Sequence, residues 1–257
     1  MFAFNVLEQP VFKRTSLLQE GNKGLRKIPL DMIYFASYQN LLLASFADFL
    51  EPKKENFSRI DELIAKNNID IDIIKLNHSN YKDIVKKQKS EQTFSNLCSL
   101  LKCFQIAKEQ SEDLVFFVED DYLHFEPMME EMIASYERIS SQLKKELFVC
   151  PTDYPYLYMN NEKTNILIGN KRHWRTVDRT LCTFMTSKIM IDQYWSNFYN
   201  NCLDRHDPFE KYLNEIYKKE FCISPLKSLS VHMTNINSSY GLSPFIDYKK
   251  IWDENSI

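Results

Sequence analysis

Short apolar runs alternate with amphipathic segments along much of the chain, and this alternation predicts an α/β fold. The runs with the length and composition of strands lie at 32–38, 69–76, 114–118 and 147–151. The segments with apolar residues at helical spacing lie at 41–50, 57–67, 97–110 and 128–143. Strands and helices that alternate from residue 32 to about residue 150 favour a mostly parallel central sheet with helices on both faces.

The second part of the chain predicts shorter elements. Strands are expected at 166–169, 182–186 and 230–235, and helices at 188–200 and 210–219. A basic loop from Lys171 to Thr180 is expected between the first two of these strands. Because no linker or internal repeat divides the chain, we predict a single domain over residues 1–257, with one half at about 30–150 and the other at about 151–257.

The most informative run, Leu114 to Val118, leads directly into the three carboxylates Glu119, Asp120 and Asp121. A continuous apolar run predicts a strand buried on both faces. Its carboxyl end is the edge where open α/β sheets bind ligands. Three adjacent acids repel one another, and oxygen ligands suit Mg²⁺ or Mn²⁺, which can bridge to substrate phosphates. The alternative is a solvated acidic turn after a core strand.

Composition narrows the classes of function. A chain of 257 residues that is 44% apolar can bury a sizeable core, and its net charge of −3 gives no global basic field for nucleic acid. The four glycines form neither a dinucleotide-binding fingerprint nor a P-loop, so phosphates would have to be held by a metal and by Arg or Lys.

The six cysteines form no CxxC pair and no zinc-type cluster, which predicts buried free thiols in a reducing compartment. The N-terminus lacks the features of a signal peptide, and no stretch approaches the length of a membrane span. We therefore expect a soluble cytoplasmic protein, and a peripheral contact with a membrane stays open, as does the oligomeric state.

An apolar strand that ends in Glu119-Asp120-Asp121 resembles the Asp-X-Asp motif of nucleotide-sugar-dependent glycosyltransferases with the GT-A fold. Glu119 in first place departs from the plain motif. The resemblance implies a GT-A-like domain, a Mn²⁺ or Mg²⁺ cofactor, a nucleotide-sugar donor and a glycan or glycolipid acceptor. It implies Asp121 as a metal ligand, with Glu119 and His232 as further ligands. It also implies that Glu119 and Asp120 contact the donor.

The same resemblance extends to other residues of the donor-binding half, about 30–150. These substrate-binding candidates are Ser37, Tyr38, Asp72, Ser95 and Asn96. Simpler explanations stay open, since Tyr38 can pack on the sheet and Ser95 or Asn96 can cap a helix. Asp153, after the strand at 147–151, is a further substrate-binding candidate.

In the acceptor-binding half, about 151–257, Arg175 and Arg179 are candidates for the diphosphate, because the arginine fork fits phosphate oxygens. An exposed basic loop is the alternative. The resemblance implies Asp207 as the general base of an inverting transfer, with Asp204 as runner-up, whereas a retaining enzyme needs no such base. Asp207 before a proline is also an ordinary helix cap, and His232 can be a structural residue.

Two other functions remain as alternatives. A nucleotidyltransferase is disfavoured because the chain lacks the Gly-rich N-terminal loop of sugar-nucleotide pyrophosphorylases. A non-catalytic glycan- or protein-binding domain could keep the same fold, and binding of a nucleotide together with a metal would count against it.

Overall fold

The structure, a computed structural model, describes part of the 257-residue chain. The described residues are 30–35, 74, 76–119, 121–125, 127–233, 236–243, 246–247 and 249–250, with only the backbone path for 30–35. The helices expected at 41–50 and 57–67 lie outside them, and so does most of the strand expected at 69–76. Ser37, Tyr38, Asp72 and Asp120 also lie outside the described residues.

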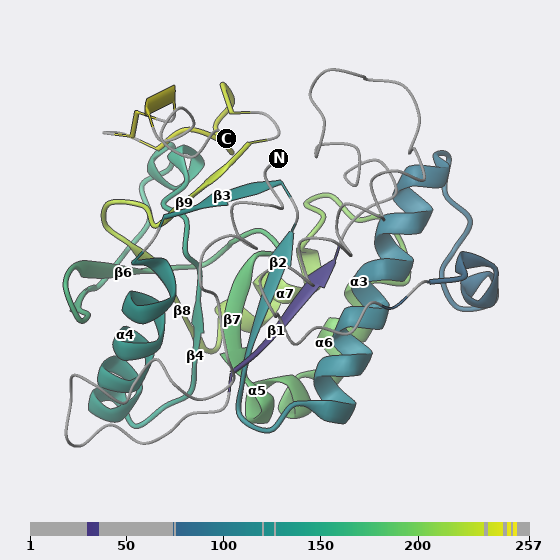
Figure 1. Ribbon diagram of the computed structural model, residues 1–257, viewed down its shortest axis with the longest axis horizontal. Coiled ribbons are helices and arrows are strands. Elements are labelled where there is room, and N and C mark those ends of the chain that lie inside the picture. Colours follow the sequence, from purple (N-terminus) through teal and green to yellow (C-terminus); the bar gives the residue numbers. More distant parts are fainter. Residues whose placement is uncertain are drawn as a thin grey trace, which may run out of the picture.

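A seven-stranded sheet forms the centre of the described structure, in the order β1-β2-β7-β4-β8-β6-β5 (Figure 1). Its strands are β1 (Leu30–Phe35), β2 (Leu114–Glu119), β4 (Leu147–Val149), β5 (Ile166–Ile168), β6 (His173–Val177), β7 (Phe184–Ser187) and β8 (Phe221–Pro225). A separate two-stranded antiparallel sheet consists of β3 (Tyr122–His124) and β9 (Ser230–His232).

The mixed α/β class is confirmed, but the prediction of a mostly parallel sheet is wrong. Only the pairs β1/β2 and β4/β8 are parallel. The pairs β2/β7, β7/β4, β8/β6 and β6/β5 are antiparallel. An apolar run that is buried on both faces has the same pattern whichever way its neighbours run, so the pattern identified strands without their direction.

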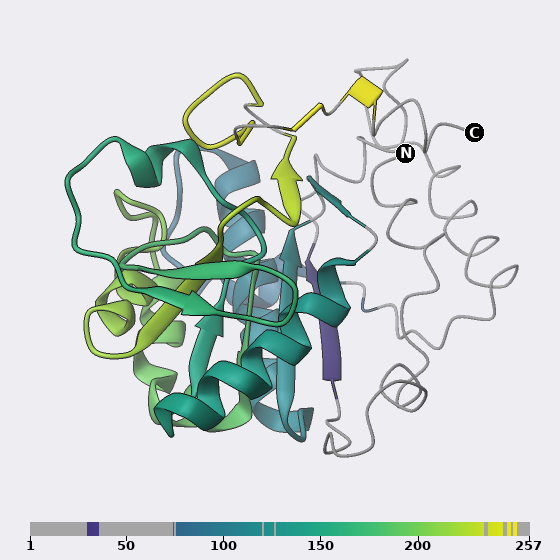
Figure 2. The ribbon, with the colours of Figure 1, turned by 90° about the vertical axis from the view of Figure 1, so that its left-hand side faces the viewer.

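Strand β2 divides the core into two layers because successive side chains of a strand point to opposite faces. Val115 and Phe117 pack in one cluster and Phe116 and Val118 in the other. The first cluster is covered by α3 (Glu91–Gln110), α5 (Lys188–Gln193), α6 (Trp195–Asn201) and α7 (Lys211–Tyr217). The second is covered by α4 (Met128–Leu143) (Figures 1 and 2). Helices on both faces are therefore present in the described part.

Several element boundaries agree with the sequence pattern, and others differ. The single helix expected at 188–200 is two helices, α5 and α6, which meet at Tyr194. Helix α4 spans the predicted residues 128–143. Helix α3 begins earlier than predicted, because the Ser90 hydroxyl accepts a hydrogen bond of 3.4 Å from the Thr93 backbone N–H and caps the helix. Ser95 and Asn96 are consequently not caps. Part of the expected basic loop is strand β6, since Trp174 packs into the second core cluster.

The strands β1, β2, β4 and β8 run in one direction, so their carboxyl ends lie at the same edge of the sheet. The small β3/β9 sheet lies at this edge, above the end of β2 in Figure 1. All six cysteines are free and buried, as predicted. Within the described ranges, no helix combines the length and the apolar character needed to cross a membrane.

Candidate functional site

An acid and a histidine meet at the carboxyl edge of the sheet. Asp121 follows β2, and His232 lies at the end of β9, whose pairing with β3 places it opposite Tyr122. His232 Nε2 lies 2.9 Å from Asp121 Oδ2. The backbone N–H of Met233 donates a 2.8 Å hydrogen bond to the Asp121 carbonyl, so backbone pairing holds the two side chains together.

Two polar atoms of this pair have no hydrogen-bond partner among the described residues. Asp121 Oδ1 and His232 Nδ1 are buried, and neither has a hydrogen-bond partner. A buried polar atom without a partner is costly, which makes such an atom a candidate for binding a ligand or ion.

These atoms fit the divalent ion that the sequence motif suggests. Among the described residues, no group of three His, Cys, Asp or Glu side chains is arranged as a metal cage, and Asp120 is outside them. Mg²⁺ usually binds one or two carboxylates and completes its shell with water and substrate phosphates. Asp121 with His232 beside it therefore fits a metal that is shared with a phosphate-bearing ligand.

Glu119, the first acid of the motif, is held by strand β7. Its backbone N–H donates a 3.0 Å hydrogen bond to Thr183 Oγ1, and the Thr183 hydroxyl donates to Glu119 Oε2 at 3.3 Å. Thr183 is fully buried just before β7 begins. The antiparallel strand thus orients the end of β2, a role that the sequence pattern did not reveal.

Two buried tyrosines lie beneath the pair. The hydroxyls of Tyr122 and Tyr154 are 2.5 Å apart, and the ring centroids of Tyr122 and His232 are 4.9 Å apart. Burial raises the pKa of Tyr122 well above its ordinary value, and the nearby negative charges of Glu119 and Asp121 add to the increase. Tyr122 is therefore a neutral group that packs against His232.

A second acid pairs with a cation at the same edge. Arg175 Nη2 lies 2.8 Å from Asp153 Oδ1, and the side chains are only 8% and 5% exposed. The Tyr158 hydroxyl donates to Asp153 Oδ2 at 2.5 Å, and its ring lies 3.9 Å from the guanidinium carbon of Arg175. Burial raises the pKa of Asp153, and Tyr158 and Arg175 offset only part of this increase.

The backbone of Asp153 is equally well held. Its N–H donates to Ser228 Oγ at 2.8 Å, and its carbonyl accepts a hydrogen bond from the Ser243 hydroxyl. Of the predicted substrate-binding residues, the structure brings Asp153 and Arg175 together as one hydrogen-bonded unit. Their functional groups are directed mainly at each other.

Glu210 is a buried acid that the sequence analysis missed. It directly precedes α7, and its Oε1 lies 4.0 Å from the thiol of Cys182. Burial raises the pKa of Glu210 from its ordinary value of 4.5 to about 7, and a backbone hydrogen bond and the nearby Arg205 offset only part of this increase. The only signal in the sequence was its place at the start of the helix predicted at 210–219, because burial cannot be read from a single glutamate.

The two aspartates predicted as general bases have other surroundings. Asp204 accepts hydrogen bonds from Lys86 Nζ at 2.9 Å and Gln88 Nε2 at 3.0 Å. These two hydrogen bonds lower the pKa of Asp204 to about 2, and the bond from Gln88 has the larger effect. Asp207 is exposed three residues before Glu210.

The contacts of the other candidates involve residues other than Asp121 and His232. Arg179 forms ion pairs with Glu162 and with Asp178, the latter at 3.2 Å. Ser95 is buried in α3, and its hydroxyl lies 3.0 Å from Nε2 of His78. Asn96 Oδ1 is buried without a hydrogen-bond partner.

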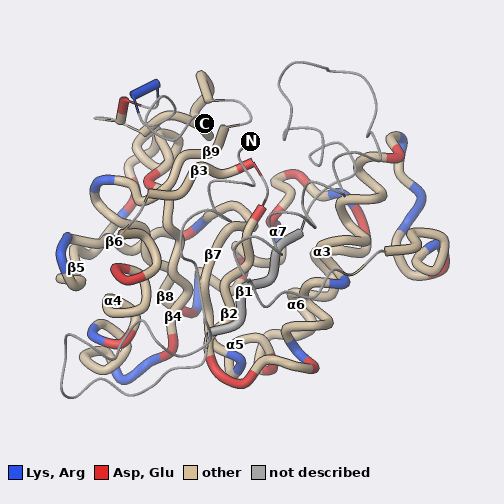
Figure 3. Tube along the Cα trace, viewed as in Figure 1, with Lys and Arg blue, Asp and Glu red and all other residues tan. Residues whose placement is uncertain are grey.

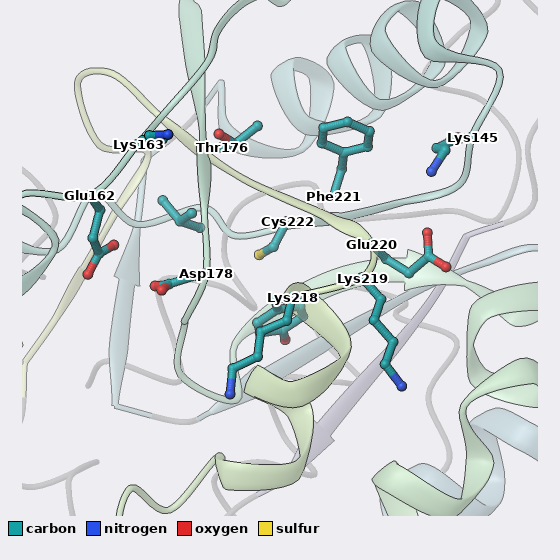
Figure 4. A pocket seen from close by; sticks show the side chains of 12 residues that line it. Lys145, Glu162, Lys163, Thr176, Asp178, Lys218, Lys219, Glu220, Phe221 and Cys222 are labelled. Atoms are coloured by element: carbon teal, nitrogen blue, oxygen red, sulfur yellow. The ribbon is translucent and has the colours of Figure 1, made fainter.

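A pocket of about 360 Å³ lies at the opposite edge of the sheet (Figure 4). Lys145, just before β4, and Phe221, at the start of β8, line it, so it adjoins the amino ends of strands whose carboxyl ends form the candidate site. Its lining mixes the cations Lys163, Lys218 and Lys219 with the acids Glu162, Asp178 and Glu220. None of the residues around Asp121 contributes to it.

Comparisons with known proteins add no family assignment. No model of a protein family matches this chain, and a search of curated proteins finds no match.

Proposed function

We propose that this protein is a metal-dependent glycosyltransferase that moves a sugar from a nucleotide-sugar to a hydroxyl of a glycan or glycolipid. The observation that carries the proposal is the Asp121–His232 pair. Its buried Oδ1 and Nδ1 atoms have no partner, and Asp121 is the last acid of the motif at the carboxyl end of β2. Ligands of open α/β sheets bind at this edge.

In this proposal Asp121 and Glu119 of the acidic motif have different parts. Asp121 binds the ion and His232 orients its carboxylate or joins it as a ligand. Glu119, held by Thr183, faces the donor. A bound Mn²⁺ or Mg²⁺ supplies positive charge that stabilises the departing diphosphate.

For a transfer with inversion we assign the general base to Glu210 rather than to Asp207. A base works best when its pKa lies near the operating pH, and the pKa of Glu210 is raised to about 7. Asp204, with a pKa of about 2, is too weak a base for this role. A transfer with retention needs no such base, and Glu210 would then bind an acceptor hydroxyl.

The test is thermal unfolding with a panel of nucleotide-sugars and nucleoside diphosphates, each with and without Mn²⁺ or Mg²⁺. A ligand at a hundredfold excess over its dissociation constant adds about 2.7 kcal/mol to the free energy of unfolding. We expect such a shift with one nucleotide only when the metal is present. Asp121→Ala should abolish the shift, whereas Asp192→Ala, which removes an exposed acid on α5, should retain it.

No shift with any nucleotide would contradict the proposal and favour a non-catalytic binding domain. A shift that does not depend on the metal would contradict the role of Asp121. Transfer to a panel of glycan acceptors, measured with the nucleotide identified in this way, then tests the enzymatic step.

A further inference from the structure

Four large apolar side chains lie exposed on one flank of the molecule. Tyr158 is the last residue of the short helix η3 (Pro155–Tyr158), and Met159 directly follows it. They are 52% and 71% exposed. Ile166 and Ile168 lie on the edge strand β5 and are 55% and 57% exposed. We call these four residues the hairpin patch, after the β5/β6 hairpin that carries two of them.

Register and contacts place Tyr158 and the two isoleucines on one face. Ile166 is paired with Arg175 across the hairpin, so their side chains point to the same face of the sheet. The ring of Tyr158 covers the guanidinium of Arg175 at 3.9 Å and therefore lies beside Ile166. Ile168 follows two residues later on the same face, whereas Leu167 packs on the opposite face with the core under α4.

Cations surround the hairpin patch. From Lys163 to Val177 the sequence contains no acid, although the whole chain has a net charge of −3. Lys163 and Lys171 are exposed before and after β5, where Figure 3 shows basic residues at the tip of the hairpin. Lys227 is also exposed, and its carbonyl accepts a 2.6 Å hydrogen bond from Arg172 Nη1. This bond holds Lys227 close to the turn between β5 and β6.

The acids near the patch are paired with cations, and the pair of Glu130 with Lys171 offsets both charges, so among the described residues the unpaired lysines of the rim are Lys163 and Lys227. Glu130 pairs with Lys171 at 2.9 Å, and Glu162 pairs with Arg179. Asp153 is buried against Arg175. The flank therefore presents exposed aliphatic and tyrosine side chains inside a basic rim. Lysines on an edge strand help to prevent association with other chains, whereas the edge strand β5 carries two exposed isoleucines.

We propose that the hairpin patch docks on the surface of a lipid bilayer that contains anionic lipids. Ile166, Ile168 and Met159 would enter the boundary between headgroups and acyl chains, and Tyr158 would lie at headgroup level. The lysines would face the anionic headgroups, because a basic rim complements a negative surface potential. Exposed apolar patches with a polar rim mark such interaction surfaces.

The position of the patch connects it with the candidate site. Tyr158 donates to Asp153, and the N–H of Asp153 donates to Ser228 two residues before β9, the strand of His232. A bilayer bound at the patch would therefore lie beside the carboxyl edge of the sheet. Delivery of a lipid-linked acceptor by this route rests on the proposed function, whereas membrane docking itself does not.

Sedimentation with vesicles tests the docking. The full chain is mixed with vesicles of phosphatidylcholine alone or with an equal share of phosphatidylglycerol. We expect binding to the anionic vesicles that weakens at high salt. Ile166→Ser/Ile168→Ser should weaken it on the order of tenfold or more. Lys163→Gln/Lys227→Gln should weaken it by about fivefold for each lysine.

Two control variants test whether the effect on vesicle binding is specific to the hairpin patch or is caused by the loss of any exposed isoleucine or lysine. Ile189→Ser removes an isoleucine that is 59% exposed on α5. Lys87→Gln/Lys89→Gln removes two exposed lysines just before α3, which Figure 3 shows on the opposite side of the molecule from β5. Both should bind vesicles as the unmodified chain does. Circular dichroism and the metal-dependent nucleotide shift, measured on every variant, should be unchanged, so that loss of docking is distinguished from loss of the proposed function.

Three outcomes would overturn the proposal. The unmodified chain could stay in the supernatant with both kinds of vesicle. The control variants could lose binding as strongly as the patch variants. Light scattering could detect a dimer that Ile166→Ser/Ile168→Ser dissociates while vesicles bind no protein, which would identify the patch as an interface between two copies of this chain.

Discussion

Two buried aspartates at the same edge of the sheet each pair with a nitrogen-bearing side chain, and they differ in how completely their carboxylate oxygens are satisfied. In the Asp153–Arg175 pair, both carboxylate oxygens have partners, from Arg175 and Tyr158. In the Asp121–His232 pair, one carboxylate oxygen and one ring nitrogen are buried without any partner. From the sequence, Asp121 and His232 were candidate metal ligands and Asp153 and Arg175 candidates for substrate binding, and their surroundings suit different tasks.

The Asp153 carboxylate contributes to architecture, because both of its oxygens are bonded and have no remaining capacity for a ligand, although Arg175 Nε is buried without a partner. An unsaturated buried pair carries an energetic cost that a ligand can relieve. We therefore expect changes at Asp153–Arg175 to act mainly on stability and changes at Asp121–His232 to act mainly on binding.

The largest expected effect is on folding. Arg175→Met leaves the Asp153 carboxylate buried without its cation and should lower the free energy of unfolding by about 3–5 kcal/mol. Urea denaturation measures the loss. Adding Asp153→Asn to Arg175→Met should recover part of it, because the uncompensated charge is then removed. A loss below about 1 kcal/mol would remove the architectural role of this pair.

Glu210 gives the next largest effect, through pH. Its pKa in the folded protein, about 7, lies above the ordinary 4.5, so the folded state binds the proton more tightly than the unfolded state. Its stabilising contribution is present below about pH 4.5 and is lost as pH rises through 7. The unmodified chain should therefore lose up to about 3 kcal/mol relative to Glu210→Gln over this range.

Denaturation curves of the two proteins from pH 4 to pH 8 measure that difference. Parallel stability profiles would contradict the raised pKa of Glu210. If Glu210 is the base of an inverting transfer, kcat/KM should rise with pH toward a plateau above about 7, and Glu210→Gln should remove this rise.

A change at His232 tests whether the Asp121–His232 pair acts mainly on binding. His232→Ala should weaken metal-dependent nucleotide binding by about 10- to 100-fold, since it removes the partner that orients the Asp121 carboxylate. Titration calorimetry with the nucleotide and Mn²⁺ measures the change. The free energy of unfolding without ligand should change far less than in Arg175→Met, and an equal loss of stability would erase the distinction between the two pairs.

The smallest expected effect tests the saturation of Asp153. Tyr158→Phe keeps the ring over Arg175 but removes the hydroxyl that donates to Asp153 Oδ2. It should destabilise the protein by about 1.5 kcal/mol, as for a hydrogen bond to a charged group. Vesicle binding should hardly change, because the exposed ring remains. If the urea concentration at the midpoint of unfolding does not change, water replaces the Tyr158 hydroxyl as the hydrogen-bond donor to Asp153.

Local pattern was sufficient for several elements. Helix α4 matches its predicted bounds because Met128 to Leu143 carries a continuous apolar face. Strand β6 was missed because the charges of Arg172 and Arg175 obscure its alternation, and α3 was predicted to begin late because Ser90 and Ser95 both fit a cap by residue type. The substrate-binding roles of Ser37, Tyr38, Asp72 and Asp120 stay predictions.

The sequence by itself determined where the core strand β2 ends and that acids follow it, because an apolar run and a carboxylate cluster are local properties of consecutive residues. The tertiary structure alone decided that β7 runs against β2, that His232 reaches Asp121 across 111 residues, and that Glu210 is buried whereas Asp207 is exposed. Strand direction, pairing between distant residues and burial depend on how the whole chain packs. For this reason the motif can be read from the sequence, but the partners that tune its chemistry cannot.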